Sequence, residues 1–162
     1  MSDSPTKKAS VPLVAIAGWL LPGAGYWLMG QKSRAKAIGI TIIAIYLLGV
    51  LVGGIRVIEV PGYDERGKPV EVEVAGLAKP IWILYGAPMQ ELRNKPWAIA
   101  QVLAGPLGIA SGAASVLSAG VADISHTPVN EAGTLFTAVA GMLNLLAIID
   151  ATHRAVHPEG DA

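Results

Sequence analysis

Three side chains near the C-terminus have the residue types and the spacing of a metal site. Asp150, His153 and His157 fall within about 60° of one another on an ideal helix, and carboxylate and imidazole groups are common zinc ligands. Pro158 follows directly, and a proline disfavours helical geometry at the residue before it. A solvated helix end, with cations close to the C-terminal dipole, explains His153 equally well. We therefore expect a helix end here, without a metal or another cofactor.

Three serines at helical spacing raise the question of a nucleophile. Ser111, Ser115 and Ser118 lie among small residues, but the chain has no Gly-x-Ser-x-Gly elbow, and the nearest histidine, His126, follows the predicted helix. Cysteine is absent, which excludes disulfides and thiolate chemistry. The sequence therefore predicts a protein that is not an enzyme.

Asn144 is the most polar residue inside the last apolar run of the chain. Polar groups within a membrane usually face other helices and can mark a functional site. We favour a structural interpretation, in which Asn144 forms a hydrogen bond between helices that contributes about 0.6 kcal/mol.

Long runs without charged side chains must position these residues. Apolar residues make up 52% of the 162 residues and charged residues only 15%, whereas soluble domains average about 25% charged. A helix needs about 20 apolar residues to cross a bilayer. Four runs qualify: Val11–Gln31, Ala37–Ile55, Ala98–Ala122 and Ala132–Ile149. The sequence thus predicts an all-α membrane protein, a four-helix transmembrane bundle.

A small extramembrane β-hairpin is expected between the second and third helices. Val57 and Glu59, and later the residues from Val70 to Val74, alternate apolar and acidic side chains as strands do. Turn residues fill the interval 61–69. The chain then divides into a polar tail (1–10), a helix pair with a Pro-Gly turn (11–55), the hairpin with an interfacial segment (56–96), a second helix pair (97–150) and a polar C-terminal tail (151–162).

Two of the apolar runs contain helix breaks. Pro22 and Gly23 interrupt the first run, and Gly105 and Pro106 interrupt the third, because proline cannot donate to the helix ladder and glycine loosens the turn. Paired broken helices build the sites of many transporters, but we favour packing kinks. Pro22 also lies within the only candidate signal-peptide cleavage site, so we expect the first helix to be retained.

Small residues recur at positions where helices or turns should approach closely. Lipid provides no hydrophobic drive between helices, so close backbone contact through small residues holds such bundles together. The expected turn and packing positions are Pro22, Gly23, Gly25, Gly30, Gly49, Gly53, Gly108, Gly112, Gly133 and Gly141, together with Asn144.

Basic residues predict an orientation. If all four runs span, nine Lys and Arg residues lie on the side of the N-terminus and three, Lys32, Arg34 and Lys36, lie on the other. Basic residues concentrate in the cytoplasm, so this arrangement places the N-terminus and the hairpin there. If the first run instead returns to its own side, the counts become five and seven, and the hairpin faces out.

The turn after the first helix resembles that of the TM-two-domain family. The residues that carry the likeness are Pro22, Gly23, Gly25, Trp27, Leu28, Gly30 and Lys32, followed by Ala37 and Gly39. The likeness covers Val11 to Gly54, although Tyr26-Trp27 replaces a stretch of His-Arg-Phe-Tyr type. The run from Gly133 to Leu146 is similar to bacterial membrane proteins of unknown function. The resemblance implies residence in a membrane and no defined activity.

Together these observations predict an integral protein of the bacterial cytoplasmic (inner) membrane. We expect a non-enzymatic scaffold or a small subunit of a membrane assembly, whose partners are the lipid bilayer and other membrane subunits or a second copy. A minimal transporter or channel component that uses the two helix breaks is the alternative. Twelve basic and twelve acidic residues cancel, so no nucleic acid partner is expected.

Overall fold

The computed structural model describes residues 9–54, 57–60, 62–63, 71–74, 77–80, 95–118 and 128–157. Its helices are α1 Val11–Leu20, α2 Ala24–Leu28, α3 Lys32–Gly53, α5 Pro96–Val102, α6 Pro106–Leu117 and α7 Pro128–Val156, and its strands are β1 Glu71–Val74 and β2 Leu77–Pro80. The part of the chain described here is therefore almost entirely helical.

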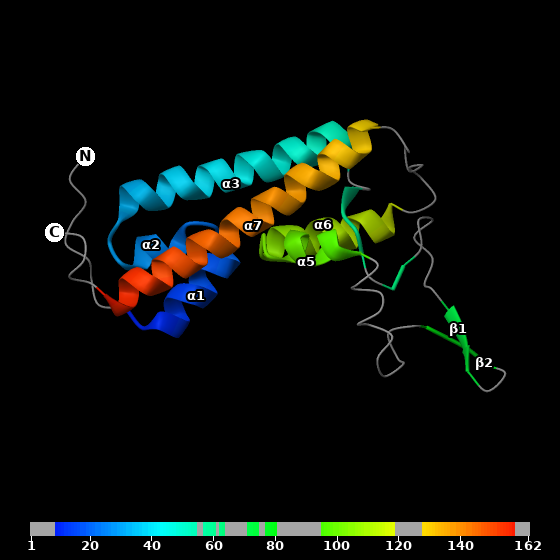
Figure 1. The fold of residues 1–162 in the computed structure, drawn as a ribbon, viewed down its shortest axis with the longest axis horizontal. Coiled ribbons are helices and arrows are strands. Elements are labelled where there is room, and N and C mark those ends of the chain that lie inside the picture. The colour runs from blue at the N-terminus through cyan, green and yellow to red at the C-terminus, as the bar shows by residue number, and fades with distance from the viewer. Residues whose placement is uncertain are drawn as a thin grey trace.

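Two long antiparallel helices, α3 and α7, form the frame of the molecule (Figure 1). Within the described residues they are the two helices long and apolar enough to cross a membrane, over Lys32–Gly53 and Val129–Val156. At about 1.5 Å per residue, each exceeds the roughly 30 Å of a bilayer core. The all-α prediction is confirmed for the described residues, and two of the four predicted spans appear as single long helices, whereas the other two apolar runs are divided into shorter helices.

The first apolar run turns back halfway along the frame. Leu21 is extended and ends α1, and Gly23 takes a left-handed conformation with φ of 87° that starts α2. α2 then lies antiparallel against α1, since Gly25 approaches the carbonyl oxygen of Val14. α1 and α2 thus form a half-length hairpin, here called the N-terminal hairpin. Lys32 begins α3 at the same end of the molecule as Val11 (Figure 1).

The third apolar run reverses in the same way from the opposite end. α5 stops at Val102, and Gly105, with φ of 76°, leads into Pro106 at the start of α6. α6 returns toward the end from which α5 came, as its contact with Ile58 shows. This second half-length hairpin is called the C-terminal hairpin. What the sequence suggested were kinks are full reversals, because each break combines a proline with a glycine of positive φ.

The reversals define two ends of the molecule. The first end holds the beginnings of α1 and α3 and the end of α7. The second end holds the end of α3, residues 57–60 and 62–63, and the beginning of α5 (Figure 1). Lys32, Arg34 and Lys36 therefore share an end with Arg154. The orientation count of nine against three placed them on opposite sides, so it does not apply to this topology.

Two clusters of buried residues form the core. One lies near the first end, around Val14, Tyr26, Met29, Ala35 and Ala151. The other lies toward the second end, where it joins α3, α7 and the turn between α5 and α6 to residues that follow α3: Ile42, Tyr46, Val57, Ile58, Ala104 and Ala140. The chain after α3 thus folds back into the helical body.

The predicted hairpin falls only partly within the described residues. β1 pairs antiparallel with β2, with Glu71 opposite Pro80 and Val74 opposite Leu77. Val57, which was expected in the first strand, is buried in the core instead. The expected turn lies almost wholly outside the described residues, as do most of the interfacial segment and residues 158–162 of the polar tail. α7 continues to Val156, beyond the expected boundary at residue 150.

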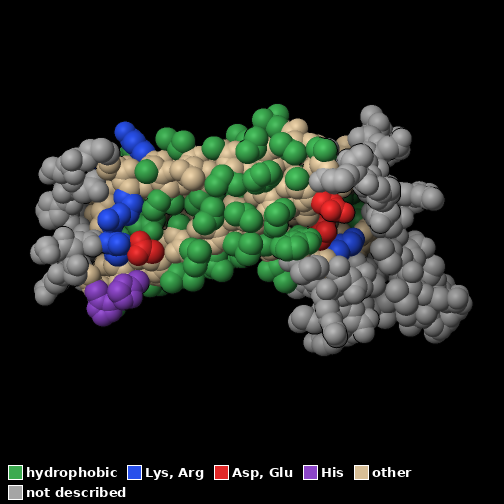
Figure 2. Space-filling view, turned by 45° about the horizontal axis from the view of Figure 1, so that its top comes forward, with side chains coloured by type: hydrophobic (Ala, Val, Ile, Leu, Met, Phe, Trp, Pro, Cys, Tyr) green, Lys and Arg blue, Asp and Glu red, His purple; other side chains and the backbone are tan. Residues whose placement is uncertain are grey.

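The molecular surface shows an apolar belt between two charged ends. Figure 2 shows hydrophobic side chains over the middle of the helical body and Lys, Arg, Asp, Glu and His side chains near its ends. Large exposed hydrophobic residues occur on every long helix, including Leu13, Ile40, Leu51, Leu117 and Leu146. An exposed apolar surface of this extent indicates a site of contact with lipid or with another protein.

Candidate functional site

The two half-length hairpins meet in the middle of the molecule. α1 and α5 approach each other end to end along α7 (Figure 1). Gly105 lies so close to the backbone of Trp19 that a side chain there would overlap the Trp19 carbonyl oxygen. The indole N–H of Trp19 donates a hydrogen bond to the carbonyl of Val102 at 3.3 Å. The last turns of α1 and α5 are therefore in direct contact.

Asn144 joins these two helix ends. Its side-chain nitrogen donates to the carbonyl of Gly18 at 3.3 Å and to the carbonyl of Leu103 at 2.9 Å. Carbonyls in the last turn of a helix lack partners within that helix, so one amide group bonds to the ends of both half-length helices. Asn144 is fully buried, and its Oδ1 has no hydrogen-bond partner among the described residues.

The contact between the two hairpins at Asn144 leaves no space for a water molecule. A small void beside Asn144, bordered by Gly18, Gly25, Tyr26 and Ala147, has an empty volume of about 150 Å³ and does not admit a water molecule. Pro22, Gly23, Ala104 and Gly105 are buried. Leu21 and Pro106, which lie next to them, are exposed, so protein covers each helix break in part.

Glycines fit the hairpins onto the frame. A side chain at Gly23 would overlap the carbonyl of Ala35, and one at Gly39 would lie 2.5 Å from the carbonyl of Pro22. On the other hairpin, a side chain at Gly141 would overlap the carbonyl of Ala100. These positions let backbone touch backbone, which is the expected use of small residues between membrane helices.

The remaining predicted packing positions are divided among three contacts. Gly49 and Gly53 of α3 lie against Gly133 of α7, where a side-chain carbon added to either would lie 2.8–3.1 Å from the Gly133 backbone. Gly108 lies against the backbone of Gln101 within the C-terminal hairpin, and Gly112 faces the side chains that follow α3. Gly30, with φ of 85°, joins α2 to α3.

Gln101 forms a second buried polar centre, between α5, α7 and the chain after α3. Its Nε2 donates to the carbonyl of Val57 and to the hydroxyl of Thr137, each at 2.9 Å. Its Oε1 accepts the backbone N–H of Glu59 at 2.9 Å. Ser115 of α6 adds a bond to the carbonyl of Ile58 at 3.2 Å. These side chains fix residues 57–59, which have no secondary-structure ladder of their own.

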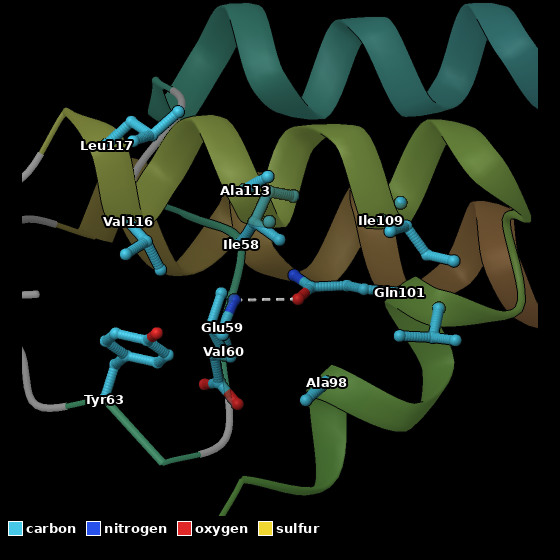
Figure 3. Close-up of a pocket in the computed structure, with 13 residues that line it drawn as sticks. Ile58, Glu59, Val60, Tyr63, Ala98, Gln101, Ile109, Ala113, Val116 and Leu117 are labelled. Atoms are coloured by element: carbon cyan, nitrogen blue, oxygen red, sulfur yellow. Dashed lines mark hydrogen bonds between the residues drawn. The ribbon is translucent and has the colours of Figure 1, made fainter. Parts of the chain in front are cut away.

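A cavity opens beside this centre (Figure 3). Glu59, Tyr63 and the side chains of the C-terminal hairpin line it, and burial raises the pKa of Glu59 while the nearby charge of Lys95 lowers it. The ammonium of Lys95 donates to the carbonyl of Val60 at 3.1 Å and to that of Tyr63. The second end thus combines a pocket, a carboxyl group and a positioned cation.

Asp150, His153 and His157, which the sequence offered as possible metal ligands, make other contacts. The carboxylate of Asp150 accepts the hydroxyl of Tyr26 at 2.7 Å and the Nε–H of Arg154 at 2.8 Å. The rings of His153 and His157 lie 4.9 Å apart and face each other at a tilt. No group of three potential ligands that could hold a metal occurs among the described residues.

Sequence reasoning singled out Asn144 but missed Gln101, Glu59 and Tyr26. Gln101 carried a usable signal, because an amide inside a run of small apolar residues must find partners when it is buried. Glu59 carried none, since in an alternating strand an acidic residue is expected to face water.

Comparison with known proteins places the chain in a family without assigning an activity. No curated protein and no solved structure matches it. The likeness of Val11–Gly54 to the TM-two-domain family stays a prediction. The model of the Family of unknown function (DUF6677) matches residues 13–161, nearly the whole length, and the chain belongs to that family.

Proposed function

We propose that this chain is an integral membrane protein in which α3 and α7 span the bilayer and the two hairpins enter it from opposite faces. Irregular backbone at membrane depth is tolerated only where protein covers it. Pro22, Gly23, Ala104 and Gly105 are buried, whereas Leu21 and Pro106 are exposed, so protein covers most of each break. The apolar belt between the charged ends (Figure 2) supports the same placement. The bacterial cytoplasmic membrane is the proposed location.

Within that membrane, the proposed role is that of a non-enzymatic subunit or scaffold in a larger assembly. One observation carries this role: the outer side of α6 is left uncovered by the rest of the fold. Leu117 is 83% exposed and Ile109 is 51% exposed. Two spanning helices cannot surround two hairpins. A neighbouring membrane protein, or a second copy, would cover this face together with lipid.

Cross-linking at single cysteines tests this role, because the chain has no cysteine. Leu117→Cys should form a disulfide or a short cross-link to a neighbour in native membranes. Ile40→Cys on α3, which is also exposed but lies on another helix, is the matched control. A monomeric mass for the solubilised protein, with no cross-linked product from either variant, would remove the support for an assembly.

A second candidate, a transporter or channel component, rests on a different observation. The ends of two half-length helices meet at a buried Asn144 from opposite faces, and paired broken helices form the sites of many transporters. Ion or solute flux in proteoliposomes, lost in Asn144→Leu or Pro106→Ala, would support this candidate. Vesicles that remain tight with the wild-type protein would count against it.

A further inference from the structure

A groove of about 210 Å³ lies between the N-terminal hairpin and α3, near the first end of the molecule. Gly23 and Gly39 form its floor, because the lack of side chains there lets the hairpin and α3 touch through their backbones. The large hydrophobic side chains along the groove are Leu21, Trp27, Ile40 and Ile43. Leu21 and Ile40 are largely exposed, so the groove opens onto the apolar belt.

Two lysines lie at the end of the groove nearest the start of α3. Lys36 lines the groove one turn before Ile40, and Lys32 lies one turn earlier on the same helix face. The Nζ of Lys32 is 6.0 Å from the centroid of the Trp27 ring. Both lysines are exposed, so a molecule in the groove can reach their ammonium groups. The groove is therefore basic at the first end and apolar toward the middle of the molecule.

The start of α3 carries positive charge without a matching anion. Lys32, Arg34 and Lys36 lie in its first two turns, and its first turn contains no acidic residue. The positive end of a helix dipole disfavours cations and attracts anions. Arg34 donates to the side-chain oxygen of Gln31 at 2.9 Å and does not line the groove. In the part of the chain that the structure describes, Lys36 forms no ion pair.

We propose that an anionic phospholipid occupies this groove, with its phosphate against the ammonium groups of Lys32 and Lys36 and an acyl chain along Ile40 and Ile43. Charge complementarity favours this lipid over a zwitterionic one, whose own cation opposes the lysines. Trp27 is half exposed beside the basic end, and such amphipathic rings concentrate at the level of the lipid head groups. The inference rests on the proposed placement of α3 across the bilayer.

Photolabelling of the full chain in vesicles tests the proposal. The vesicles contain phosphatidylglycerol or phosphatidylcholine, each with the same photoreactive diazirine in its acyl chain, and mass spectrometry locates the label after digestion. Phosphatidylglycerol should label residues 21–43. Phosphatidylcholine should label them roughly 20-fold less, the combined effect of two basic residues near an anionic lipid. Equal labelling by the two lipids would overturn the proposal.

Charge variants distinguish a site from a general attraction of anionic lipid to this end. Lys36→Gln should reduce labelling by phosphatidylglycerol roughly fivefold, and Lys36→Arg should retain most of it. Arg34→Gln removes the same charge two residues away, from a side chain outside the groove, and should label close to the wild-type level. An equal loss in Lys36→Gln and Arg34→Gln would contradict a site in the groove.

The groove and the membrane placement need separate measurements. Ile43→Trp fills the groove and should abolish the labelling, whereas Leu47→Trp, on an exposed residue one turn further along α3, should not. Extraction of the vesicles with sodium carbonate reports whether the chain spans the bilayer. Release of the wild-type protein would overturn the placement of α3 and this proposal with it. Retention, combined with unchanged labelling in Ile43→Trp, would overturn the lipid site alone.

Discussion

Asn144 caps two helices at once. Its amide provides donors to the carbonyls of Gly18 and Leu103, which belong to hairpins that enter from opposite ends. Without it, the last turns of α1 and α5 would meet as carbonyl groups with neither water nor backbone donors to satisfy them. A single side chain in α7 thus holds the centre of the molecule together.

Replacing Asn144 should therefore destabilise the whole fold. Each hydrogen bond makes a net contribution of about 0.5–1.5 kcal/mol to stability. Because Asn144→Ala removes both bonds, it should lower the free energy of unfolding by about 1–3 kcal/mol. Reversible unfolding in detergent measures this value. Leu146→Ala, at an exposed position of the same helix, should have a much smaller effect. If both variants were equally stable, the two carbonyls would have to find other donors.

The buried carboxyl group of Glu59 predicts a pH dependence. Burial raises the pKa of Glu59 above its usual value, and the nearby charge of Lys95 opposes this only in part. The folded state then holds the proton more tightly than the unfolded chain, so stability is greatest at low pH and falls as the pH rises through the pKa of folded Glu59.

Thermal unfolding between pH 4 and pH 8 measures this effect. The wild-type protein should lose stability across the range, and Glu59→Gln should lose less, because its side chain cannot ionise. Glu131→Gln, which removes a carboxylate from the first turn of α7, keeps Glu59 and should retain the wild-type slope. The interpretation would be wrong if Glu59→Gln showed the same slope.

At the scale of the elements, glycine contacts decide how the hairpins fit the frame. A side chain at Gly141 would overlap the carbonyl of Ala100, whereas a side chain at Gly112 would lie 3.5 Å from Val60, at ordinary contact distance. Both glycines lie in helices. They therefore form a matched pair in which only the available space differs.

Gly141→Ala should push α5 away from α7 and cost about 1–3 kcal/mol, as overpacking usually does. Gly112→Ala should be neutral or stabilise the protein by up to about 1 kcal/mol, since alanine is the better helix former. Unfolding of the two purified variants provides the comparison. A tolerated Gly141→Ala would show that α5 can shift along α7 without cost.

The sequence predicted where these helices lie along the chain better than the direction in which each one runs. The charge-free runs located α3 and most of α7, and Pro22 and Gly105 marked the two places where the chain changes direction. The reversals were not predictable from composition, because a Pro-Gly pair fits a kink as well as a return. The return depends on tertiary contacts far apart in sequence, such as Gly39 with Pro22 and Asn144 with Leu103.

The candidate site was predictable to a smaller extent. Asn144 stood out because amides are rare in apolar runs, and its role between helices followed from the chemistry of the membrane. The cavity could not be found, since Glu59 and Lys95 are 36 residues apart and meet only because the chain after α3 folds back into the core.

The whole molecule has a topology that differs from a four-span bundle in a measurable way. Lys32 and Val156 mark the same end of the frame, and the start of α7 marks the other (Figure 1). In a four-span arrangement, the start of α3 and the start of α7 would share a side. Ser33 therefore lies on the same side as Thr152 in the observed topology, and on the same side as Asn130 in a four-span bundle.

Labelling of single cysteines with an impermeant maleimide in intact cells distinguishes these arrangements. Ser33→Cys and Thr152→Cys should behave alike, and Asn130→Cys should behave oppositely. Permeabilised cells, in which all three should react, provide the control. Labelling of Ser33→Cys together with Asn130→Cys, and protection of Thr152→Cys, would restore the four-span arrangement.

The central place of α7 also sets an order of events during synthesis. α3 and both half-length hairpins pack on α7, but α7 follows all of them in the chain, and chains generally fold from the N-terminus as they are made. Until it arrives, Gly18 and Leu103 lack their shared donor, and Gly49 and Gly53 of α3 lack the backbone of Gly133 against which they pack. A nascent chain that ends before residue 128 should therefore be more sensitive to proteases than one that includes α7, and both hairpins should become stable together once α7 has been made.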